Sequence, residues 1–87
     1  MSNLSKLPNI GKEIERQLAA VGVTTYEQLK VTGAYGAWLL IQSIDPSACI
    51  HRLMALEGAI RGVKKSELPV ESKEELKAFY QAHKVTR

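Results

Sequence analysis

The stretch Leu7-Pro8-Asn9-Ile10-Gly11-Lys12 most constrains how this chain folds, because it predicts a tight turn that opens a helix. Proline fixes its own φ and has no N–H to leave unpaired, whereas asparagine and glycine tolerate a positive φ at low cost. The apolar residues around and after the turn share one face of a helix, as Ile10, Ile14, Leu18 and Val21. We therefore expect a helix over about residues 11–21, ended by Gly22.

Helix signals recur along the rest of the chain, and no segment keeps the alternation of a strand. Further helices are expected over about residues 25–31, 34–43, 46–61 and 72–83. Capping boxes at Thr24–Glu27 and Ser72–Glu75 open two of these helices, and Asp45 with Pro46 opens a third. The sequence therefore predicts an all-α fold, one compact five-helix domain over residues 1–87.

Two of the predicted helices contain residues that indicate how they pack. Segment 34–43 is apolar nearly all round, which is typical of a buried central helix, so we place Trp38 at the centre of the core. In segment 46–61, Gly58 costs about 1 kcal/mol relative to alanine, which indicates close approach of another backbone along a seam of small residues. Glu57, with Arg61 four residues later, is either an ordinary helix pair or a partly buried acceptor that locks this helix to the hairpin.

One cysteine and two histidines limit the chemistry that the chain can support. No internal disulfide or metal framework can be built from them, and a single cysteine, Cys49, fits a reducing cytoplasm. The N-terminus lacks the pattern of a signal peptide, and the longest apolar run is far too short to span a bilayer. We expect a cytoplasmic protein with no cofactor, no metal and no membrane contact.

Catalysis is weakly supported by the sequence. The glutamates lie among lysines at helical spacing, as on a solvated helix face, whereas a catalytic pair needs a shielded site. Cys49 lies at an apolar position, which is typical of a core residue rather than a nucleophile. The sequence therefore predicts a protein that is not an enzyme.

The hairpin, the helix behind it and the Gly22-Val23-Thr24 elbow resemble the helix-hairpin-helix superfamily. A wider match over about residues 4–83 includes Leu56-Glu57-Gly58-Ala59-Ile60-Arg61-Gly62 and resembles the C-terminal domain of TfoX/Sxy proteins, regulators of natural competence (DNA transformation). The resemblance implies a helix-hairpin-helix-like N-terminal half. It also implies a non-enzymatic regulatory interaction module, linked to transcriptional control of competence, with the transcription machinery or an activator as its protein partner.

The hairpin also implies an alternative function, weak sequence-independent binding of duplex DNA. Such hairpins aim backbone N–H groups and a helix N-terminus at phosphates. The candidate residues are Asn9, Ile10, Gly11 and Lys12, and a second basic group consists of Arg61, Lys64 and Lys65. Glu13 in the same turn repels phosphate, and the net charge of +3 is modest. A purely structural turn and solvated loop lysines are the other readings of these residues, so both functions stay open.

Overall fold

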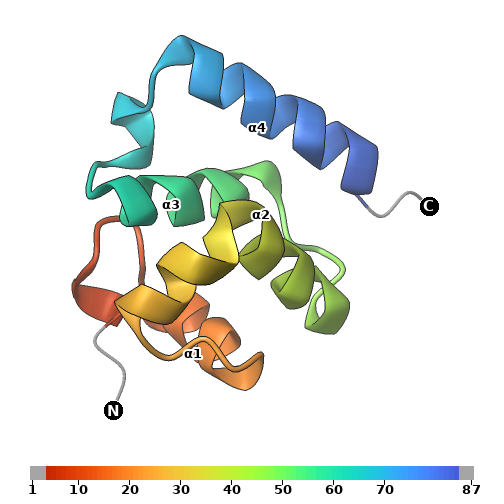
Figure 1. The fold of residues 1–87 in the computed structure, drawn as a ribbon. Helices are drawn as coiled ribbons and strands as arrows, with labels where there is room; N and C mark the ends of the chain where they lie inside the picture. Colours follow the sequence, from red (N-terminus) through yellow and green to blue (C-terminus); the bar gives the residue numbers. More distant parts are fainter. Residues whose placement is uncertain (1–3, 85–87) are drawn as a thin grey trace.

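The computed structural model of the protein describes residues 4–84, and that part of the chain contains helices joined by turns, without a strand (Figure 1). Its four α-helices are α1 (Lys12–Ala20), α2 (Tyr26–Ile44), α3 (Ile50–Arg61) and α4 (Val70–His83). Two 3₁₀ turns, η1 (Leu4–Lys6) and η2 (Lys65–Glu67), precede α1 and α4. Helix α3 runs through the middle, with α4 on one side and α1 and α2 on the other (Figure 1). Within this range no helix has the length and apolar character needed to cross a bilayer.

The predicted number of helices is wrong by one, although the all-α class is confirmed for the described residues. The segments expected at 25–31 and 34–43 are joined in α2, which kinks at Gly33 instead of ending there. Gly33 has φ 79° and ψ 162°, a conformation that glycine adopts at low energetic cost. One non-helical residue therefore redirects the axis, and the helix resumes without a loop.

Three helix starts lie away from their predicted positions. Helix α2 is capped by Thr25, whose Oγ1 accepts from the Gln28 N–H at 3.1 Å, one residue later than the predicted capping box. Helix α4 begins at Val70, directly after Pro69, and not at residue 72. Helix α3 begins at residue 50 and not at 46, because the Asp45 carboxylate closes a turn over residues 46–47 instead of capping the helix.

The core is centred on Trp38, which is completely buried, so the predicted burial is confirmed. Its indole Nε1–H donates to the Cys49 carbonyl at 3.2 Å. Its ring makes T-shaped contacts with the rings of Phe79 and Tyr80, at centroid distances of 6.0 and 5.7 Å. The tryptophan thus ties α2 both to the start of α3 and to α4. The other fully buried large side chains are Leu4, Leu18, Leu29, Ile41, Leu53, Leu56 and Leu76.

The C-terminal half of α2 is not buried on all sides, contrary to the expectation for segment 34–43. Its inward face is covered, but Tyr35, Leu39, Leu40 and Ile44 are 38–50% exposed. The three neighbouring helices of so short a chain cover only part of its circumference, which leaves the outer face to solvent.

The helix-hairpin-helix-like half is also not matched in the described residues. The hairpin follows η1, a 3₁₀ turn of three residues, and not an α-helix. The turn is held instead by a distant segment of the chain, described below.

Candidate interaction surface

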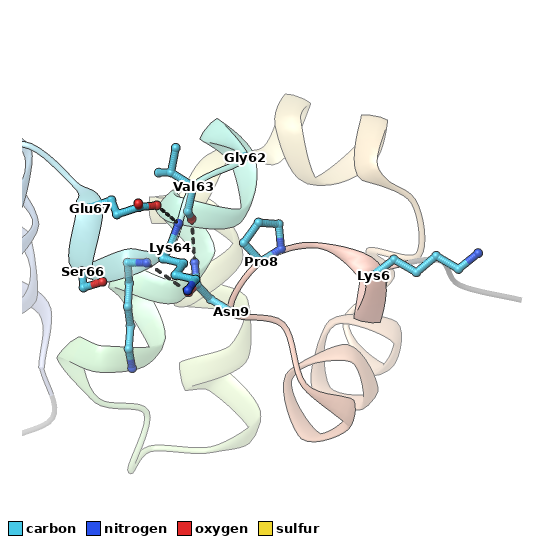
Figure 2. A pocket seen from close by; sticks show the side chains of 9 residues that line it. Lys6, Pro8, Asn9, Gly62, Val63, Lys64, Ser66 and Glu67 are labelled. Carbon is cyan, nitrogen blue, oxygen red and sulfur yellow. Dashed lines mark hydrogen bonds between the residues drawn. The ribbon is translucent and has the colours of Figure 1, made fainter.

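Asn9 joins the N-terminal hairpin to the turn that follows α3. Its amide Nδ2 donates to the Val63 carbonyl at 3.0 Å, and its Oδ1 accepts from the Lys65 N–H at 3.0 Å (Figure 2). Asn9 is also the one non-glycine residue with a positive φ, 69°, in the described part of the chain. Asparagine tolerates that conformation and its side-chain amide supplies both a donor and an acceptor. The Asn9 amide can therefore hydrogen-bond to the backbone of another segment as a peptide group would.

Gly58 makes this junction sterically feasible. A Cβ at this position would lie 2.5 Å from Asn9 Nδ2 and 2.7 Å from the Val63 carbonyl oxygen. The close approach of another backbone expected at Gly58 is therefore present. It is made by the turn at Val63 and Lys65, together with the Asn9 side chain, rather than by a neighbouring helix. Gly62, with φ 77°, ends α3 and turns the chain back so that the Val63 N–H donates to the Gly58 carbonyl at 2.9 Å.

The junction brings together two groups of residues that lie more than fifty positions apart. An open depression of about 680 Å³ lies between them, shown in Figure 2. Its walls are Lys6, Pro8 and Asn9 from the N-terminal segment and residues 62–67 from the other. We call these two segments, 6–12 and 61–67, the hairpin–turn surface.

The hairpin residues differ in what they can offer a partner. Ile10 is 4% exposed and packs in the core, and its N–H donates to the Leu7 carbonyl, so neither its side chain nor its N–H is available. Gly11 and Lys12 are exposed, and no side chain caps the N-terminus of α1. The N–H groups of the first turn of α1 are consequently open to an acceptor. Glu13 in that turn pairs with Arg16.

The basic residues of the second group are engaged to different degrees. Arg61 Nε donates to Glu57 Oε2 at 2.5 Å within α3, so Glu57 forms an ordinary i,i+4 pair and does not lock the helix to the hairpin. Lys64 and Lys65 are exposed, and the local hydrogen bonds involve their backbone groups. Their N–H groups donate to Glu67 and Asn9 respectively, and their carbonyls accept from the Glu67 and Leu68 N–H groups. Their side chains can therefore be changed without breaking the junction.

Lysines surround the depression without converging on it. The Lys6 side chain extends away from the hollow into solvent (Figure 2). The Glu67 carboxylate, which accepts from the Lys64 N–H at 3.1 Å, places a negative charge on the same rim. This arrangement suits a mixed polar contact over an extended surface better than tight capture of a single anion.

A polar cluster around Asp45 was missed by sequence reasoning. Oδ1 accepts from the N–H and hydroxyl of Ser47, while Oδ2 accepts from Gln17 Nε2 at 2.9 Å and from Arg52 at 2.8 Å. These hydrogen bonds, led by that of the Ser47 hydroxyl, hold the pKa of Asp45 well below its ordinary value. The Asp-Pro-Ser sequence could have indicated the turn, but not partners in α1 and α3. The cluster joins three segments and has no visible catalytic arrangement.

Clusters of metal-ligating side chains are absent from the described residues. Residues 4–84 contain no group of three or more His, Cys, Asp or Glu side chains that could hold a metal ion. Cys49 is a free, half-buried thiol beside the start of α3, and its carbonyl serves Trp38.

Comparison with known protein families shows which family this chain belongs to. The model of the TfoX C-terminal domain matches residues 1–80. The chain belongs to the TfoX C-terminal domain family. Protein Sxy of Escherichia coli K12 is 34% identical to it over 73 residues, which cover 84% of this chain and 35% of Sxy. The chain thus spans about a third of the length of that relative.

Solved structures resemble this TfoX C-terminal domain closely. An uncharacterized protein from Listeria monocytogenes, in a triclinic crystal form, has a TM-score of 0.91 and 44% identity, with 93% of this chain and 92% of that chain covered. A protein of unknown function from the same organism, in a tetragonal form, has a TM-score of 0.88 and 44% identity, covering 90% and 96% of the two chains. These similarities support the fold and add no partner.

Proposed function

We propose that this TfoX C-terminal domain is a non-enzymatic regulatory interaction module that acts in transcriptional control of natural competence. The observation that carries the proposal is family membership over residues 1–80 together with similarity to Sxy. Its protein partner is a component of the transcription machinery or an activator, and the contact is made through the hairpin–turn surface.

The hydrogen-bonded junction supports this choice of surface. Asn9 fixes the hairpin against residues 63–65 through two hydrogen bonds, so the exposed side chains around it are carried on a rigid frame. Binding to a preformed surface costs less conformational entropy than binding to a mobile loop. The exposed Lys64 and Lys65 favour a partner that is acidic at the point of contact.

Capture of partners from the native host, with and without nuclease, tests the proposal. Wild-type domain should retain a protein after nuclease treatment, and the double variant Lys64→Glu, Lys65→Glu should lose it. Lys77→Glu with Lys84→Glu, two exposed lysines of α4 and its C-cap that lie outside the hairpin–turn surface, is the matched control and should retain the partner. Equal capture by both double variants would contradict the assignment to this surface.

Weak, sequence-independent binding of duplex DNA is a second candidate function, and one observation favours it. The N-terminus of α1 lacks a side-chain cap and lies beside the exposed Lys12, an arrangement that suits a phosphate. Glu13 in the same turn opposes it, so any affinity is expected to be low.

A further inference from the structure

The outer face of the C-terminal half of α2 presents apolar side chains to solvent. Leu39, Leu40 and Ile44 are each 38–50% exposed there. Tyr35, at the margin of the exposed side, stacks on Phe79 of α4 at a centroid distance of 4.1 Å. No residue from 31 to 44 is charged. The Ser43 hydroxyl, on the same side, donates back to the Leu40 carbonyl at 2.6 Å, so it is directed to its own helix.

Such a face is unusual on a helix that borders solvent. A surface helix normally places charged or polar residues outward, and a contiguous apolar patch marks an interaction site. This half of α2 lies at the edge of the molecule in Figure 1. The face lies apart from the hairpin–turn surface, whose residues come from other elements.

The spacing of large and small residues makes this face complementary to itself. Gly36, Leu40 and Ile44 follow one another at intervals of four and form a single column along the helix. When two such columns meet antiparallel about a two-fold axis at Leu40, Gly36 lies opposite Ile44 of the partner subunit. Leu40 then lies opposite the partner's Leu40. A large side chain thus fills the gap left by a glycine at both ends of the contact, as an isologous interface requires.

We propose that a second copy of this chain covers the face, forming an antiparallel two-fold dimer centred on Leu40. The absence of charged residues from α2 after Lys30 favours a second copy of the chain as the partner. Two copies, each of net charge +3, repel each other least when they meet through a segment that carries no charge. Residues 31–44 themselves offer no counter-charge to a strongly acidic or basic partner. The three partly exposed side chains of Leu39, Leu40 and Ile44 span less than the roughly 800 Å² per partner of a standard interface, so the dimer is weak and dissociates on dilution.

Sedimentation velocity over a range from low micromolar to millimolar concentration tests the dimer. The weight-average mass of the wild type should rise from 9.6 kDa toward twice that value. Leu40→Glu and Leu40→Lys should each remain monomeric, because each places two like charges at the axis. An equimolar mixture of the two should associate again as a one-to-one dimer, since opposite charges then meet.

Val31→Glu is the matched control, because Val31 is 89% exposed on the other half of α2 and outside the face. It should self-associate as the wild type does. Thermal unfolding followed by circular dichroism establishes that each variant is folded. A wild type that stays monomeric at every concentration would overturn the dimer, as would association that survives Leu40→Glu. Failure of the mixed variants to associate would overturn the register centred on Leu40.

Discussion

Gly58 has only a hydrogen atom as its side chain, and this lets the hairpin pack against the end of α3. Gly58→Ala should lower the free energy of unfolding by roughly 1–3 kcal/mol, because its Cβ would meet Asn9 Nδ2 at 2.5 Å and a backbone oxygen at 2.7 Å. Urea unfolding measures the loss. Gly36→Ala, measured at a dilution at which the chain is monomeric, is the control, since a Cβ there meets only the Thr32 methyl group, at 3.1 Å. If both substitutions have the same effect, helix propensity alone explains the result.

Asp45 is the residue at which pH should act on stability. Its folded-state pKa is lowered from the ordinary 3.8 by hydrogen bonds from Ser47, then Arg52 and Gln17. The unfolded chain therefore binds the proton more readily, and this contribution to stability is full above about pH 5 and is lost as pH falls toward the folded-state pKa. Unfolding free energies at about pH 7 and about pH 3 should differ less in Asp45→Asn than in the wild type. An unchanged difference would contradict the assignment.

At the scale of elements, Trp38 connects three helices. Trp38→Ala should cost about 3–5 kcal/mol, because the indole is fully buried, meets Phe79 and Tyr80 of α4, and donates to Cys49 before α3. Chemical unfolding of the wild type and the variant measures this loss. Trp38→Phe, which keeps an aromatic ring, is the milder control. Iodide quenching of the wild-type tryptophan at the level of free indole would refute its burial.

At the scale of the whole molecule, two basic groups on one surface separate the two proposed functions. Fluorescence anisotropy with duplex DNA at low salt should give at most weak binding, with a salt slope on the order of −2 to −4, since few phosphates are neutralised. Lys12→Glu should abolish this binding without unfolding the domain, because Lys12 is exposed at the start of α1.

The double variant Lys64→Glu, Lys65→Glu, which reverses both charges, tests the other half of the hairpin–turn surface in the same assay. If it abolishes DNA binding while Lys12→Glu has no effect, the contact lies on the turn after α3 and the hairpin hypothesis is wrong. No anisotropy change with the wild-type domain would remove the DNA function altogether. The protein-interaction function would then stand alone.

Local sequence by itself determined the helical class, the burial of Trp38 and the turn at Asn9, because periodicity, apolar content and conformational preference act within a few residues. Only the tertiary structure decided that Asn9 bonds to residues 63 and 65, that Asp45 bonds to Gln17 and Arg52, and that the helix break expected at Gly33 is a kink. It also decided which side of α2 stays exposed. These outcomes depend on which distant segments pack together, and the same local pattern is compatible with several such packings.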